Sequence, residues 1–176
     1  PSHLYTYEDA IAEMVPYIRE VTEYAERLGI RTCTENHGKI FQAAERVEEL
    51  IRAVNRENYG WLVDMGNFAF CNQMPMEGYE RLRDYIEYIH IKDSFYDGTI
   101  VPAGQGKGEI EAILKLYNDF TDREVILTLE PHLTTFSGLD KLSNMDDIKV
   151  QNAFETPELA FDAGTQALRE ILSRIG

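Results

Sequence analysis

The sequence predicts an α/β fold built on a parallel sheet, because short apolar strands alternate with longer segments of helical periodicity. The strand-like runs are residues 30–34, 61–63, 88–91 and 125–129, and each is followed by a helical segment. A helix that returns the chain over the sheet makes successive strands parallel. Four such units make half of an eight-stranded (β/α)₈ barrel of about 250 residues. A small open, doubly wound sheet is the alternative.

The helices are predicted from apolar spacing and from start signals. Thr6 with Asp9 resembles a helix start, and Pro16 should kink this first helix or mark a second start. Thr156 as N-cap and Pro157 at the first helical position begin the last helix. The predicted buried faces are Ile11, Met14, Ile18, Val21, Ala25 and Leu28 in the first helix; Ala44, Val47, Ile51 and Val54 within 41–55; Tyr79, Leu82 and Ile86 within 77–86; Ile110, Ile113, Leu114 and Tyr117 in the fourth; and Ala160, Ala163, Ala167, Ile171 and Ile175 in the last.

Length and composition limit the class of protein. The 176 residues are enough for a single domain, 1–176, and the 44% hydrophobic and 11% aromatic fractions fit a globular core. A net charge of −14 repels phosphate backbones, so no nucleic-acid partner is predicted. No apolar run approaches the roughly 20 residues of a membrane helix, so no membrane partner is predicted either. Cys33 and Cys71 lack CxxC spacing, which favours a reduced, cytoplasmic protein.

Two stretches are predicted as loops. Residues 94–108 contain the glycine-rich run Gly104-Gln105-Gly106-Lys107-Gly108. This run fits neither GxGxxG nor GxxxxGK[ST], so it predicts a flexible loop of the active site and not a nucleotide site. Residues 134–154 are polar and irregular, with a short helix expected near Asp146.

Each predicted strand ends on a group that can bind a metal or carry a proton. These groups are Glu35, Asp64, His90 and Glu130, at intervals of 29, 26 and 40 residues. Ligands bind at the carboxyl ends of parallel strands, so the four side chains are candidates for one shared site. Three carboxylates and an imidazole suit Mn²⁺ or Mg²⁺ best, with Zn²⁺ or Co²⁺ as alternatives. The competing interpretation is four unrelated polar residues that cap strands.

Further polar residues follow the same strand ends and are candidates for binding substrate. His37 and His132 each lie two residues beyond a candidate glutamate, although a loop histidine is often structural. Asn67 could hydrogen-bond a ligand or stabilise a turn beside Gly66. Lys92 lies on the same side of its strand as the candidate histidine two residues earlier and could hold a substrate oxyanion or pair with an aspartate. Asp93 could orient His90 or Lys92.

At these residues the chain resembles the xylose isomerase-like barrel family of sugar and sugar-phosphate isomerases and epimerases. The phrases that carry the resemblance occur in order through most of the chain: Thr34-Glu35-Asn36-His37-Gly38, Val63-Asp64-Met65-Gly66-Asn67, His90-Ile91-Lys92-Asp93, Gly104-Gln105-Gly106, Leu129-Glu130-Pro131-His132 and the helix at 156–161. Single phrases are weakly specific, whereas five in this order are fairly specific.

The resemblance implies a (β/α)₈ TIM barrel of the xylose isomerase-like type, of which only the last four βα units are present and strands one to four are missing. It implies that Glu35, Asp64, His90 and Glu130 bind one divalent metal ion at the ends of strands five to eight. It implies that Glu35 and Glu130 act as acid and base on a small sugar or sugar phosphate, through a metal-stabilised enediolate. A half barrel leaves sheet edges open, so its missing N-terminal half or a second copy of itself is the expected partner.

Two departures keep other functions open. Some epimerases of the family have His where Asn67 stands and Arg where Tyr96 stands, so the substrate cannot be transferred from them. A dehydratase of a keto-polyol, similar to inosose dehydratase, is one alternative, and a non-catalytic half-barrel binding domain is another. The related apurinic endonucleases need more histidines than the four in this chain, which argues against DNA repair.

Overall fold

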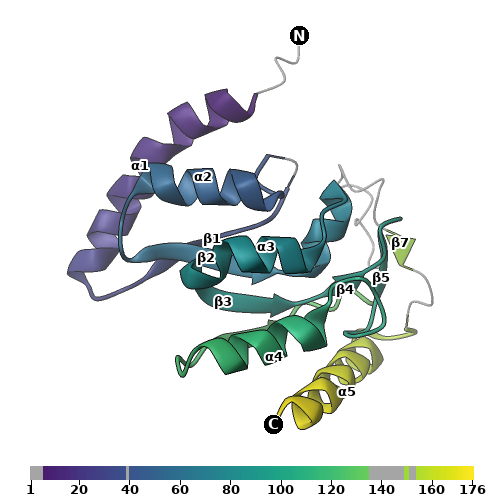
Figure 1. Cartoon of the computed structure of the whole chain (residues 1–176). Helices are drawn as coiled ribbons and strands as arrows, with labels where there is room; N and C mark the ends of the chain where they lie inside the picture. Colours follow the sequence, from purple (N-terminus) through teal and green to yellow (C-terminus); the bar gives the residue numbers. More distant parts are fainter. Residues whose placement is uncertain (1–5, 39, 135–148, 151–153) are drawn as a thin grey trace.

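The computed structural model describes residues 6–38, 40–134, 149–150 and 154–176 (Figure 1). A helix comes first, and strands then alternate with helices, which confirms the predicted α/β class. The stretch around Asp146, where the sequence predicts a short helix, lies outside the described residues. Within the described part of the chain, no helix combines the length and apolar character needed to cross a membrane.

Four parallel strands form the main sheet. Their spatial order follows the sequence: β1 (Thr32–Glu35), β2 (Tyr59–Asp64), β3 (Ile86–Ile91) and β6 (Ile126–Leu129). These strands lie side by side at the centre of the molecule, with the helices around them (Figure 1). All four predicted strands are present, and their bounds differ from the predicted ones by a few residues. Sequential parallel strands with intervening helices are the arrangement found in half of a (β/α)₈ barrel.

Among the described residues, five α-helices accompany this sheet. They are α1 (Tyr7–Arg27), α2 (Ala44–Val54), α3 (Pro75–Leu82), α4 (Ile110–Phe120) and α5 (Pro157–Ile175). Thr6 and Asp9 form a capping box at α1, and the Thr156 hydroxyl caps α5, as their sequences predict. Pro16 lies within a continuous α1, so no second helix starts there. Neighbouring helices pack in pairs, α1 on α2, α2 on α3 and α4 on α5.

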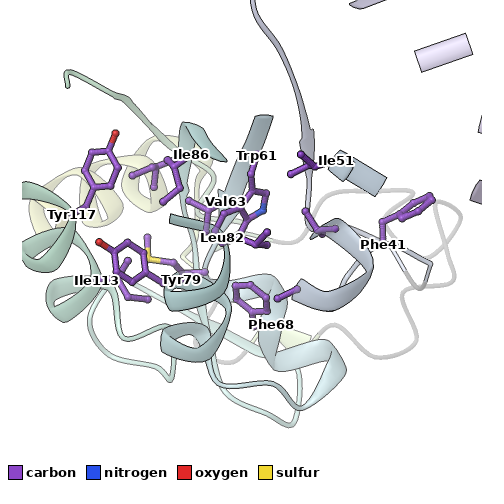
Figure 2. Packing of buried hydrophobic residues seen from close by; sticks show 14 of the residues in the cluster. Phe41, Ile51, Trp61, Val63, Phe68, Tyr79, Leu82, Ile86, Ile113 and Tyr117 are labelled. Carbon is purple, nitrogen blue, oxygen red and sulfur yellow. The ribbon is translucent and has the colours of Figure 1, made fainter. Parts of the chain in front are cut away.

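The core lies between the sheet and the helices. Alternate strand residues such as Trp61, Val63 and Ile89 are buried there, because side chains along a strand point to opposite faces. Leu82 and Tyr79 of α3 and Ile113 and Tyr117 of α4 lie in the same cluster, which Figure 2 shows from close by. The other face of the sheet carries polar residues at the strand ends. The core therefore fixes the strands, and the opposite face is left for chemistry.

The buried face of α1 matches the prediction only in part. Ala25 is buried and Ile11 and Ile18 pack against the core, as predicted. Met14, Val21 and Leu28 are exposed, and the helix buries Ala10, Val15 and Thr22 instead. Apolar residues cover two sides of this helix, and periodicity alone does not show which side faces α2. The small side chains of Ala10 and Ala25 suit the side where α1 approaches its neighbour closely.

Two other segments also differ from expectation. The predicted third helix ends at Leu82, a 3₁₀ turn (η2, Arg83–Tyr85) follows, and Ile86 already belongs to β3. The predicted loop 94–108 contains an antiparallel hairpin of β4 (Asp93–Ser94) and β5 (Thr99–Val101), which β7 (Lys149–Val150) extends to three strands. Asp97 and Gly98 form the tight turn of that hairpin. An Asp-Gly pair is a known hairpin signal, but it is hard to recognise here because the whole segment is rich in glycine.

Candidate metal centre

The four candidate ligands converge at one end of the sheet. Glu35, Asp64 and His90 come from the last or second-last position of β1, β2 and β3, and Glu130 follows β6 directly. Each residue offers one ligand atom, and these atoms all lie within 4.8 Å of one another. The convergence follows from the fold, because parallel strands in sequential order end at the same edge. The geometry that the strand spacing predicts is therefore present.

Three buried atoms of this cluster, Asp64 Oδ2, His90 Nδ1 and Glu130 Oε2, make no well-aligned hydrogen bond, and their nearest polar neighbours are charged groups of the same cluster and Lys92. Buried polar atoms gathered in this way are costly, and they call for an explanation such as a bound ion. His90 Nδ1 lies 2.9 Å from Glu130 Oε2 and 3.4 Å from Glu35 Oε1. Ligands at right angles around an ion, each about 2.1 Å from it, lie about 3 Å apart. The residues present thus fit a divalent cation.

Lys92 places a positive charge beside the cluster. Its Nζ lies 2.7 Å from Asp64 Oδ2 and 3.5 Å from Glu130 Oε2, and the side chain is only 5% exposed. Burial raises the pKa of the Asp64 carboxyl, and the Lys92 ammonium opposes that shift. Burial of Lys92 itself acts to lower its pKa, but the charges of Asp64 and Glu130 raise it. Lys92 is therefore an ammonium that balances part of the buried negative charge.

Neighbouring side chains orient the two glutamates. His132 Nε2 lies 2.6 Å from Glu130 Oε1, and the Asn67 amide donates to Glu35 Oε1 at 3.2 Å. Burial acts to raise the pKa of Glu130, but the hydrogen bond from His132 and the charge of Lys92 outweigh it and lower the pKa. Each glutamate thus has one oxygen held by a neighbour, as is common around metal ligands.

His37 is the one candidate that the fold keeps apart from the cluster. Its side chain is exposed, and among the described residues it makes no hydrogen bond or ion pair, while its backbone N–H bonds to Glu35 O. Asn36, between these two residues, has a role that the sequence analysis missed. Its buried amide donates to Asp64 O at 2.8 Å and accepts from Asp64 N at 2.8 Å and from Trp61 Nε1. Asn36 thereby joins the ends of β1 and β2.

Asp93 faces the glycine-rich loop and not Lys92. Its Oδ2 accepts the N–H groups of Gly104 and Gly106 at 2.8 and 2.9 Å, and its Oδ1 accepts those of Gly108 and Ser94 at 2.7 and 2.9 Å. The expected flexible loop is therefore attached to the end of β3 by a buried carboxylate. These four N–H groups are already hydrogen-bonded to Asp93, which agrees with the absence of a nucleotide-binding motif in the loop.

The sequence profile of the xylose isomerase-like TIM barrel family matches residues 2–134. With this match and four sequential parallel strands that end in a cluster of carboxylates and an imidazole, the chain belongs to that family. This confirms the predicted fold and the resemblance seen in the sequence. No curated protein matches the sequence.

Several solved structures share the fold at low sequence identity. The IOLI protein with a bound zinc atom is 19% identical, with a TM-score of 0.72, and the match covers 99% of this chain and 60% of that one. D-psicose 3-epimerase with D-tagatose, from Clostridium cellulolyticum H10, is 15% identical with a TM-score of 0.70, over 95% of this chain and 57% of that one. A xylose isomerase-like TIM barrel protein from Mycobacterium smegmatis in complex with magnesium is 19% identical with a TM-score of 0.61, over 90% and 52%.

The chain thus spans about half to three fifths of the length of these structures. At such identities the likeness establishes the fold, and the chemistry of this chain has to be argued from its own residues.

Proposed function

We propose that this chain carries the metal centre of a divalent-metal-dependent isomerase or epimerase of a small sugar or sugar phosphate. Glu35, Asp64, His90 and Glu130 would hold the ion. One observation carries the proposal: potential ligand atoms from four residues at the ends of four strands lie within 4.8 Å of one another.

The two glutamates would move the proton. A bound divalent ion polarises a carbonyl and the neighbouring hydroxyl of the substrate, which acidifies the C–H beside them. One glutamate carboxylate takes that proton to give an enediolate, and the other returns a proton to the opposite face. His132 binds Glu130 Oε1 while Oε2 points to the cluster, so the Glu130 carboxylate is held ionised and oriented for this role. Asn67 orients the Glu35 carboxylate in the same way.

The remaining candidate residues would bind the substrate beside the two glutamates. Asn67 and His132 lie beside the glutamates and offer groups that can bind sugar hydroxyls. Lys92 supplies a fixed positive charge next to Asp64, which favours negative charge that develops on the substrate. His37 is exposed at the end of β1 and would have to reach the substrate from the rim.

The proposed ion and substrate are inferred from the types of ligand and from the structural relatives. Three carboxylates and one imidazole favour Mn²⁺ or Mg²⁺, with Zn²⁺ or Co²⁺ as alternatives. Structural relatives have magnesium or zinc bound, and the epimerases among them were solved with D-fructose, D-tagatose or D-allulose. The relatives also include a probable 3-DHS dehydratase, so loss of water is the second reaction to test.

Solvent-deuterium exchange tests the proposal. The protein, loaded with Mn²⁺, is incubated in D₂O with a panel of ketoses and their phosphates, and NMR follows the protons beside the carbonyl. We expect deuterium at that carbon, and loss of the signal in Glu35→Gln and Glu130→Gln. Glu20→Gln is the matched control, since Glu20 lies exposed on α1. Loss of water from the substrate would favour the dehydratase, and absence of both reactions over the panel would contradict an enzymatic role.

A further inference from the structure

The glycine-rich loop and β4 form a second polar centre, and its composition is opposite to that of the proposed metal centre. Four backbone N–H groups, from Ser94, Gly104, Gly106 and Gly108, point at one carboxylate, that of Asp93. The donor–acceptor distances are 2.7 to 2.9 Å, and Asp93 is only 1% exposed. Backbone N–H groups that converge on one anion in this way form a concave site similar to an anion-binding nest.

The glycines of the loop are required by the approach of this carboxylate. A Cβ at Gly106 would collide with Asp93 Oδ1, and one at Gly108 would lie 2.8 Å from the same oxygen. Gly104 has a φ of +83°, a conformation that other residues rarely adopt. Three glycines at alternate positions therefore let the backbone surround an anion, and the chain supplies that anion from Asp93, the first residue of β4.

We propose that residues 94 and 104–108 form a carboxylate-binding nest that is filled from within by Asp93, and that this occupancy fixes the loop beside the metal centre. Asp93 is then a positioning residue, and the nest is an anion site that a small free carboxylate can take over when the side chain is removed. The inference is independent of the proposed enzymatic function, because it involves neither the metal nor a substrate.

Asp93 lies between two residues that make polar contacts of their own, so its bond to the loop affects the surroundings of the candidate ligands. Lys92, the preceding residue, binds Asp64, and Ser94, the following residue, donates its hydroxyl to Gly66 O at 2.8 Å. Three consecutive residues therefore attach β3 to the cluster, to the loop and to the turn that follows β2. Loss of the central attachment should release the loop.

Chemical rescue tests the proposal. In Asp93→Gly we expect the midpoint of thermal unfolding to fall by roughly 5–10 °C, because the N–H groups lose their acceptor. Sodium formate, which is small enough to enter the vacated space, should restore at least about half of that loss and should saturate, as site binding does. Sodium chloride at equal ionic strength is the control for screening. An equal response to formate and chloride would overturn the proposal.

A matched variant separates the nest from an ordinary turn. Asp97, on the same hairpin, accepts the N–H of Thr99 at 3.0 Å. Asp97→Gly should show no saturable response to formate, and an equal rescue of both variants would also overturn the proposal.

If Asp93→Gly does not fold, hydrogen exchange on the wild-type protein tests the proposal instead. The amides of Gly104, Gly106 and Gly108 should exchange more than about 100-fold more slowly than in an unstructured peptide, and unprotected amides would contradict the nest.

Discussion

Two buried aspartates, Asp64 and Asp93, lie in opposite surroundings. Asp64 is the last residue of β2, and Asp93 is the first residue of β4, two residues after the end of β3. Asp93 has four backbone N–H donors for its two oxygens. Asp64 is completely buried, its Oδ1 accepts the N–H of Asn67, and its Oδ2 lies 2.7 Å from Lys92 Nζ. The first carboxylate is surrounded by backbone donors, and the second by one ammonium and the other candidate ligands.

We interpret this difference as the one between a structural carboxylate and a candidate functional one. A fold that gathers acidic groups in a largely buried place gives up stability, and such a cost is commonly found at functional sites. Burial and residue type are the same at both positions, so neither identifies the candidate ligand. The informative feature is that potential ligand atoms of Glu35, His90 and Glu130 gather within 4.8 Å of that of Asp64.

The largest effect on stability is expected at the Asp64–Lys92 pair. Asp64→Asn should lower the free energy of unfolding by about 3–5 kcal/mol, because it leaves the buried ammonium of Lys92 without its nearest partner. The double variant Asp64→Asn, Lys92→Met removes both charges and should recover most of that loss. Denaturant unfolding measures both. If the double variant is as unstable as the single one, the pair is not the origin of the effect.

Removal of a ligand should have the next largest effect, this time on metal binding. Glu130→Gln should weaken Mn²⁺ binding more than about 100-fold, beyond the roughly 10–100-fold that is typical when only a neighbour of a ligand is changed. Isothermal titration calorimetry measures the affinity. Glu109→Gln serves as control, because Glu109 binds the N–H of Met76 away from the cluster. Equal affinity in Glu130→Gln and wild type would remove Glu130 from the ligand set.

Asp93 should respond differently from Asp64, since its partners are all donors. Asp93→Asn turns one acceptor oxygen into an NH₂ group that faces two N–H donors. We expect a loss of about 2–3 kcal/mol in the free energy of unfolding. The Mn²⁺ affinity should stay within about threefold of wild type, because Asp93 binds no atom of the four ligands. Urea titration and calorimetry on the same protein check both values, and a metal affinity that falls together with stability would place Asp93 in the metal centre.

The sequence predicts the convergence of the four candidate ligands better than it predicts the surroundings of Asp93, for a physical reason. Glu35, Asp64 and His90 lie at the ends of strands whose apolar pattern is local, and parallel topology then brings the strand ends together without further information. The partners of Asp93 depend on the path of a loop up to fifteen residues further along, which no periodicity encodes. The buried side of α1 was predicted only in part for a similar reason, because the choice between its two apolar sides depends on contact with α2.

The smallest of these effects is expected at His132, a neighbour of one candidate ligand. Its Nε2 is 2.6 Å from Glu130 Oε1, so it contacts a candidate ligand and is not itself one of the four. His132→Gln keeps a donor of similar reach, whereas His132→Ala removes it. We expect about a 10-fold loss of Mn²⁺ affinity in the alanine variant and a smaller loss in the glutamine variant, with little change in stability since His132 is partly exposed. Equal losses in both variants would mean that the imidazole itself, and not its hydrogen bond, supports the centre.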